Sequence, residues 1–160
     1  MIRPLDRGAQ EELAQVADRM RLTLIEVLGA PVGADMYSIE WLRERVRWHL
    51  DASAVLGEVL VAEIEGGVRG HILLRIEVDE NGERTGLFAT TYVEPEWRRR
   101  GVGRALLQRG EAWLLAHAPS WLATNTSATN RPLIELFERQ GYRIVLEDPA
   151  RGMVRLARRV

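Results

Sequence analysis

A cluster of positive charge and glycine, Arg98–Gly103 (RRRGVG), stands between a strand-like segment that ends at Val93 and an apolar segment with helical spacing. The first turn of a helix presents backbone N–H groups without intrahelical partners, and the helix dipole adds partial positive charge there. Glycine removes the side chain that would keep a ligand off this backbone, and arginine adds charged donors. The segment therefore has the chemistry of a phosphate or pyrophosphate site.

Other interpretations of this cluster remain open at this point. The two glycines can form an ordinary turn, and the arginines can form a solvated corner. The segment lacks the GK[ST] of a Walker loop and the third glycine of a dinucleotide fingerprint. Nucleic-acid binding through Arg98, Arg99 and Arg100 is an alternative, but no stacking aromatic residues alternate with them, so we expect no nucleic-acid partner.

Composition narrows the class of protein. With 160 residues, 46 % of them hydrophobic, we expect one domain with its own core, spanning residues 1–160. The chain has no cysteine, and all 22 basic residues are arginine, which excludes a thiol or lysine nucleophile. No His, Asp or Glu grouping has metal-ligand spacing, so we expect no metal. Without an apolar leader or an apolar run of about 18 residues, a cytoplasmic protein with no membrane partner is expected.

The order of periodic segments predicts an α+β fold with a mixed sheet. Helical spacing covers Leu13–Leu28, which Gly29 can end, and Ile39–Leu50, which Ser38 can cap. Three strands then form an antiparallel meander, over Val59–Ile64, Val68–Val78 and Arg84–Val93. The middle strand alternates apolar and more polar residues, so we expect one face of it to be buried and His71 to lie on the polar face.

The second half of the chain has helix and strand patterns in alternation. A helix is expected from Gly101 to about His117, and a strand from about Leu122 to Thr126. A further helix covers Pro132–Gln140, with Asn130 as its cap and Gly141 at its end. Two closing strands surround the turn DPARG, so the predicted order is ααβββαβαββ.

Two segments resemble signatures of the GNAT superfamily of N-acetyltransferases. VEPEWRRRGVGRALL is similar to its acyl-CoA-binding motif, [Q/R]-x-x-G-x-[G/A], with Arg98, Gly101 and Gly103 at the motif positions. TNRPLIELFERQGYRIV is similar to a second signature of the family, carried here by Asn130, Leu136, Phe137, Gly141 and Tyr142. The resemblance covers roughly residues 56 to 146, and both motifs occur in the family's order.

The resemblance implies the GNAT acyl-CoA N-acyltransferase fold, a mixed and mostly antiparallel sheet flanked by helices. It implies direct transfer of an acetyl group from acetyl-CoA, the co-substrate, to a primary amine. Backbone groups of Tyr92, Val93 and Glu94, at the end of the strand Arg84–Val93, would bind the pantetheine arm. Backbone N–H groups from Arg100 to Ala105 would bind the pyrophosphate. The cofactor-binding residues implied are Tyr92, Val93, Glu94, Arg98, Arg99, Arg100, Gly101, Val102, Gly103, Arg104, Ala105, Asn130 and Phe137.

Two departures from the family pattern bear on the acceptor. Phe137 stands where many members have a tyrosine that protonates the leaving thiolate. Asn125 stands where acetyltransferases of protein N-termini often have a glutamate, and the strand GLFATTYV lacks the carboxylate base of histone-type members. A small-molecule amine is therefore the favoured acceptor. The alternative is a domain that binds acyl-CoA without catalysis, and whether the protein forms a homodimer stays open.

The catalytic residues stay unassigned from sequence. His71 and Tyr92 are weak candidates, and Glu77 and Tyr142 are further ones, although each of these residues can equally be structural. His49 and His117 are interpreted as ordinary helix-surface residues. Trp41 and Trp48, on one helix, either line an acceptor pocket or pack in the core.

Overall fold

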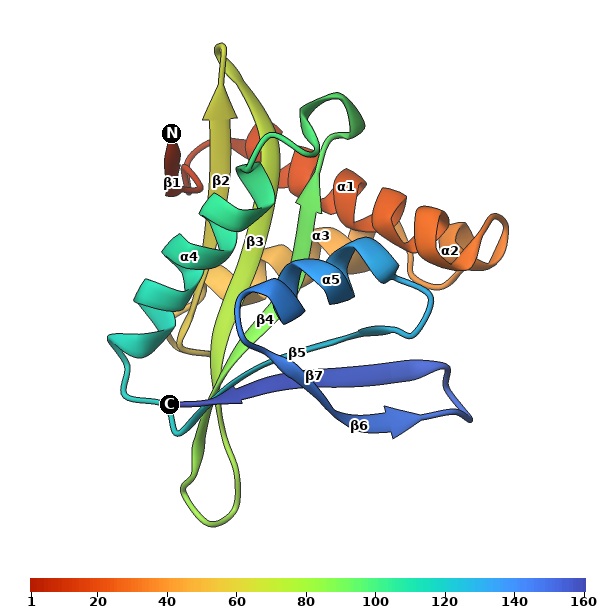
Figure 1. Cartoon of the computed structure of the whole chain (residues 1–160). Coiled ribbons are helices and arrows are strands. Elements are labelled where there is room, and N and C mark those ends of the chain that lie inside the picture. Colours follow the sequence, from red (N-terminus) through yellow and green to blue (C-terminus); the bar gives the residue numbers. More distant parts are fainter.

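A seven-stranded sheet with helices on both faces organises the chain in the computed structural model, which describes residues 1–160 (Figure 1). The strands are β1 (Ile2–Pro4), β2 (Gly57–Ile64), β3 (Gly67–Val78), β4 (Arg84–Val93), β5 (Trp121–Ser127), β6 (Arg143–Asp148) and β7 (Met153–Arg159). The helices are α1 (Gln10–Leu28), α2 (Val32–Asp35), α3 (Ile39–Leu50), α4 (Val102–Leu115) and α5 (Arg131–Arg139), and a 3₁₀ turn covers Pro95–Trp97.

The sheet order is β1-β2-β3-β4-β5-β7-β6, and every neighbouring pair is antiparallel except β4 and β5. The predicted α+β class with a mixed, mostly antiparallel sheet is therefore confirmed. The sequence interpretation missed β1 and α2, because three or four residues are too few to show a period. None of the helices combines the length and the apolar character needed to cross a bilayer.

The ends of the helices show which local signals were correct. The Ser38 hydroxyl accepts the Trp41 N–H at 3.1 Å, which confirms the predicted cap of α3. Gly29 and Gly141 both have positive φ, 77° and 91°, where glycine is favoured. Asn130 occupies the predicted N-cap position of α5, but its side chain does not cap the helix, because its amide donates to the Thr126 hydroxyl at 3.0 Å.

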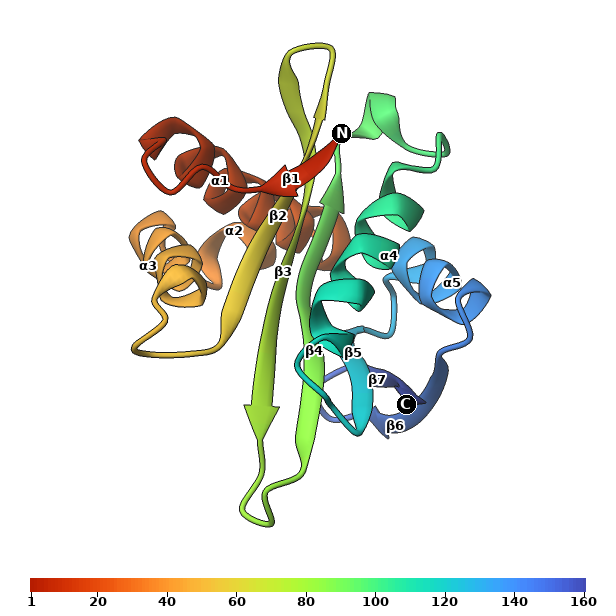
Figure 2. The same cartoon turned by 90° about the vertical axis from the view of Figure 1, so that its left-hand side faces the viewer.

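Helices cover both faces of the central strands (Figure 2). Helices α1, α2 and α3 lie on one face, and α4 and α5 lie on the other. On β3, Leu73 belongs to the apolar cluster under α1 and α3, and Leu74 belongs to the cluster under α4 and α5. The expectation of a half-exposed strand is wrong, since His71 is fully buried as well. On that face His71 is buried and Arg75 is partly buried, and Glu77 near the end of the strand is exposed.

Strands β4 and β5 pair over only four residues each. The parallel ladder runs from Thr85 and Trp121 to Phe88 and Thr124, where the Thr124 hydroxyl donates to the Phe88 carbonyl at 2.9 Å. Beyond that point β5 turns away from β4, and α5 crosses the front of the opening (Figure 1). The β3–β4 register shifts at the same level, which leaves Ala89 as an extra residue, a β-bulge.

We expect Leu74→Ala to lower the free energy of unfolding by about 2–5 kcal/mol, because it opens a cavity in a closely packed layer. Leu74 is fully buried, and its Cδ2 atom lies 3.0 Å from where a Cβ would stand on Gly110 of α4. The control is Leu146→Ala on the edge strand β6, where the side chain is 60 % exposed and the change should stay within about 0.5 kcal/mol. Urea unfolding of both variants tests this, and equal losses would contradict the described packing.

Candidate active site

The start of α4 presents a row of free backbone donors. Gly101 precedes the helix with φ of 83°, and the first helical bond runs from the Ala105 N–H to the Gly101 carbonyl at 3.0 Å. The N–H groups from Arg99 to Arg104 have no acceptor in the protein, whereas the N–H of Ala105, expected among the free donors, is bonded within the helix. Consecutive free N–H groups at a helix start form a binding site for an anion.

The two glycines serve this segment differently. A Cβ on Gly101 would meet no atom within 4 Å, so glycine is favoured there by its positive φ. A Cβ on Gly103 would lie 3.3 Å from Leu136 Cδ2 and 3.8 Å from Val93 Cγ2. Gly103 is therefore the point where α4, the end of β4 and α5 come together.

The arginines of the cluster also have separate roles. Arg98 donates from Nε to the Val93 carbonyl at 2.7 Å and from Nη2 to both Glu26 carboxylate oxygens at 2.9 and 3.0 Å. It therefore connects α1 to the end of β4. Arg99, Arg100 and Arg104 form no ion pair, although Arg100 lies over the Trp97 ring at 5.0 Å. Their charges remain available to a ligand at the helix start.

The opening between β4 and β5 exposes one edge of β4. The Glu94 N–H donates to the Arg69 carbonyl at 2.8 Å, so Glu94 faces the β3 side. Backbone groups alternate along a strand, so Tyr92 also faces β3, whereas Thr91 and Val93 face the opening. Among the three residues expected to bind pantetheine, Val93 is the one whose backbone groups point into the gap.

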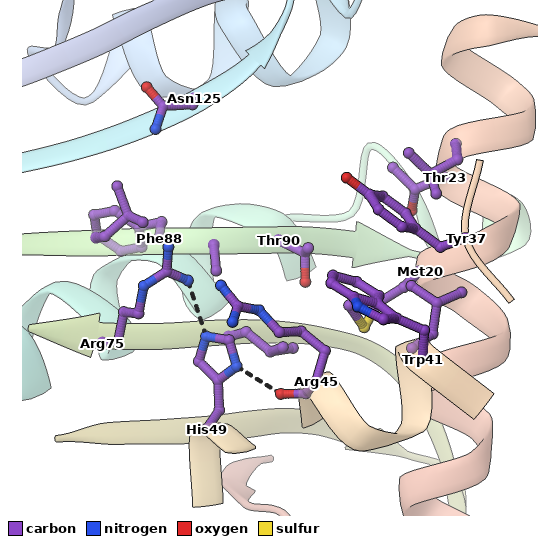
Figure 3. A pocket seen from close by; sticks show the side chains of 15 residues that line it. Met20, Thr23, Tyr37, Trp41, Arg45, His49, Arg75, Phe88, Thr90 and Asn125 are labelled. Atoms are coloured by element: carbon purple, nitrogen blue, oxygen red, sulfur yellow. Dashed lines mark hydrogen bonds between the residues drawn. The ribbon is translucent and has the colours of Figure 1, made fainter. Parts of the chain in front are cut away.

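A cavity of about 290 Å³ lies where the β4–β5 ladder ends (Figure 3). Its lining comes from α1, α3, β3, β4 and β5 together with Tyr37, which precedes α3, and contains no Asp or Glu. The bulge residue Ala89 and its neighbours Phe88 and Thr90 form part of this lining. An acyl group that followed the exposed edge of β4 would reach this cavity.

Trp41 and Trp48 are not core residues. Trp41 is 44 % exposed, lines the cavity and stacks on Tyr37 with ring centroids 4.2 Å apart. Trp48 does not line the cavity. The Arg45 guanidinium lies over the Trp48 ring, 4.1 Å from its centroid. The hypothesis of an aromatic wall therefore applies to Trp41, together with Tyr37, which the sequence analysis did not consider.

His49 lines the cavity and is 99 % buried, so its interpretation as a helix-surface residue is wrong. Its Nε2 lies 3.2 Å from Arg75 Nη1, and a guanidinium can only donate, so Nε2 is the unprotonated acceptor. Its Nδ1–H donates to the Arg45 carbonyl at 2.9 Å. Burial, with Arg75 nearby, lowers the pKa of His49 to about 4. Its spacing from Leu42 and Val46, seven and three residues, already placed it on the apolar stripe of the helix.

The weak catalytic candidates do not face the cavity directly. His71 is fully buried and absent from the lining, and its Nε2 lies 3.3 Å from the hydroxyl of Thr90, which does line it. Burial, with the charge of Arg19, lowers the pKa of His71 to about 3. The Tyr92 ring stacks on His71 at 6.0 Å. Glu77 is a half-exposed partner of Arg75.

The residues of the second signature lie on the other face of the sheet. Phe137 is fully buried and meets the rings of Phe88 and Tyr142 edge-on, at 5.2 and 5.0 Å. The Tyr142 hydroxyl donates to the Glu111 carboxylate, and burial and this carboxylate raise its pKa. Both side chains pack the core under α4 and α5. No three His, Asp or Glu side chains are placed together to hold a metal ion.

Comparison with known proteins defines the family. The profile of the acetyltransferase (GNAT) family matches residues 17–142, so the chain belongs to this family. This confirms the resemblance inferred from the two motifs. Mycothiol acetyltransferase of Thermobifida fusca is 30 % identical over 74 residues, which are 46 % of this chain and 23 % of that protein. The matched stretch therefore spans about a quarter of the length of this curated relative.

Solved structures with low sequence identity share the fold. The protein yncA of Salmonella typhimurium, determined with acetyl-CoA, has a TM-score of 0.79 and 18 % identity, covering 99 % of this chain and 92 % of that one. The PaiA N-acetyltransferase of Thermoplasma acidophilum, determined with coenzyme A, has a TM-score of 0.77 and 16 % identity, covering 100 % and 98 %.

The buried His71 predicts a pH dependence of stability. Its pKa is about 3 in the folded state and about 6.5 unfolded, so the unfolded state binds more protons between these values, and stability falls as the pH falls from 6.5. Between pH 7 and pH 5, wild type should lose about 2 kcal/mol more unfolding free energy than His71→Leu does. Urea unfolding at both pH values measures the difference, and parallel losses would contradict the neutral, buried state.

Proposed function

We propose that the chain is an N-acetyltransferase that transfers an acetyl group from acetyl-CoA to the primary amine of a small molecule, with residues 1–160 acting as one domain. The observation that carries the proposal is an alignment of three features. Free N–H groups at the start of α4, the exposed edge of β4 at Val93 and the cavity at Ala89 follow one another along the opening between β4 and β5.

The chain offers suitable partners for each part of acetyl-CoA. The N–H groups of Arg99–Arg104 and the unpaired guanidinium groups of Arg99, Arg100 and Arg104 fit a pyrophosphate. Thr91 and Val93 offer backbone groups to a pantetheine arm, once Arg98 releases the Val93 carbonyl. Two solved neighbours were determined with CoA or acetyl-CoA, which supports this donor.

When bound, acetyl-CoA supplies a thioester whose carbonyl carbon the amine attacks, so that a C–N bond forms and the thiol leaves. The amine must be neutral to attack. No carboxylate lines the cavity to accept its proton, but Arg45 and Arg75 line it, and their positive charge lowers the pKa of a bound ammonium group. His49 stays neutral because burial, with the charge of Arg75 nearby, lowers its pKa to about 4. The small size of the cavity supports a small-molecule acceptor.

The proposal is tested by thiol release from acetyl-CoA in the presence of a panel of primary amines, with mass spectrometry of the products. At least one amine should gain about 42 Da, the mass added when an acetyl group replaces a hydrogen atom. This gain should rise in step with thiol release. A protein that binds acetyl-CoA in calorimetry but acetylates no amine would instead be a non-catalytic acyl-CoA-binding domain.

Gly103→Val should weaken acetyl-CoA binding by more than about tenfold, because added methyl groups would push on Leu136 and Val93 where α4, β4 and α5 converge. Arg99→Ala should cost about 1 kcal/mol or less, since it removes one exposed and screened charge and leaves the backbone donors in place. Calorimetry of both folded variants measures the two effects. If the Gly103→Val variant bound acetyl-CoA with wild-type affinity, the proposed pyrophosphate site would be contradicted.

Phe137→Tyr should change kcat by less than about tenfold, because position 137 lies in the core and the proposal assigns it no acid role. The new hydroxyl should lower the free energy of unfolding by about 1–3 kcal/mol, since it lies among apolar rings. The assay is kcat against pH with the best amine, and Phe137→Leu is the apolar control. A gain above about 100-fold would mean that the natural protein lacks an acid it needs.

A further inference from the structure

The cavity contains two guanidinium groups and no acidic side chain. Arg45 of α3 and Arg75 of β3 both belong to its lining, and both point into it (Figure 3). They are close enough that both lie over the ring of Trp48, at 4.1 Å and 5.6 Å from its centroid. The two guanidinium groups carry like charges and repel each other, and the low dielectric of partly buried surroundings strengthens this repulsion.

The protein itself offsets only part of this charge. Arg75 donates from Nε and Nη2 to Glu77 at 3.2 and 3.1 Å, and the Glu77 carboxylate lies outside the cavity lining. Its Nη1 is directed at the neutral His49. Arg45 has no carboxylate partner within ion-pair distance and donates no side-chain hydrogen bond within the protein. Its guanidinium lies over the rings of Trp48 and Trp41, at 4.1 and 5.9 Å from their centroids.

Burial and the charge of Arg75 lower the pKa of Arg45. This direction agrees with an excess of positive charge in the cavity. The titratable groups near Arg45 are Arg75 and the half-exposed Glu77 of β3, Tyr37 before α3, and the neutral His49 of α3 itself. An arginine stays charged in proteins despite such a shift. The cavity therefore keeps a net positive charge that a bound anion would neutralise.

Resting on the proposed acetyl transfer, we propose that the acceptor amine also carries an anionic group, a carboxylate or a phosphate, which binds between Arg45 and Arg75. Planar guanidinium groups recognise both anions through paired hydrogen bonds. His49 is a positioning residue in this arrangement, because its Nε2 holds the Arg75 guanidinium at the cavity wall. Amines that carry only positive charge, such as polyamines, are disfavoured acceptors.

The rest of the cavity fits the other parts of such a molecule. Tyr37 and Trp41 form a flat, stacked aromatic wall on the side away from Asn125 (Figure 3). This wall suits an apolar or aromatic portion of the acceptor. Thr90 and Ala89 lie at the β4 bulge, where the amine would meet the thioester.

The test compares probes that differ in the anionic group, by calorimetry on the protein saturated with CoA. L-phenylalanine is compared with L-phenylalaninamide, and 2-aminoethyl phosphate with 2-aminoethanol. We expect at least one anionic probe to bind about tenfold tighter, or better, than the counterpart that lacks the carboxylate or phosphate. Preference within the first pair identifies a carboxylate acceptor, and preference within the second identifies a phosphate.

Arg45→Ala and Arg75→Met should each reduce that preference by about tenfold and leave acetyl-CoA binding unchanged. The matched control is Arg47→Ala on α3, which removes one charge at an exposed position whose guanidinium pairs with Glu44 outside the cavity. A preference retained in both cavity variants, or equal or undetectable binding of all four probes, would overturn the inference. Arginine-dependent binding of an anionic probe without acetyl transfer would support this site and refute the proposed function.

Discussion

The early end of the parallel β4–β5 ladder is the constraint on which the rest of the site depends. The strands pair only as far as Phe88 and Thr124. At this last pair the Thr124 hydroxyl also donates a hydrogen bond to the Phe88 carbonyl. The bulge at Ala89 follows immediately, and bulges increase local twist and bend a strand. Beyond this point β4 still pairs with β3, but its other edge has no neighbouring strand to bond. In the proposed function this opening is the route of the acyl chain, and it leads to the cavity at Ala89.

Burial of both faces of β3 explains the unusual state of the polar residues near the cavity. Its residues meet α1 and α3 on one side and α4 and α5 on the other, so His71 is fully buried and the side chain of Arg75 is only 13 % exposed. Burial disfavours a second proton on His71 and His49, and both therefore act as neutral hydrogen-bonding groups. Neither supplies charge to the site, so the arginines determine its electrostatics.

Positive charge is present at both ends of the opening, but in different forms. At the start of α4 it comes from backbone N–H groups and from exposed arginines, which suits a phosphate that is itself exposed to water. In the cavity it comes from two partly enclosed guanidinium groups fixed by Trp48 and His49. Arg98 stands apart from both groups, because its bonds to Glu26 and Val93 connect α1 to the strand.

The sequence by itself determined what depends on a few neighbouring residues: most helices and strands, the Ser38 cap, the turn at Gly101 and the family, through its two motifs. Spacing could also have placed His49 on the buried face of α3. Only the tertiary structure decided which surfaces are covered, so the exposed face expected for β3 and the surface position of His49 were wrong. It also brought together Arg45 and Arg75, whose charges belong to separate elements. Alternation and helical spacing show that an element has two faces, but they carry no information about which other element packs on each face.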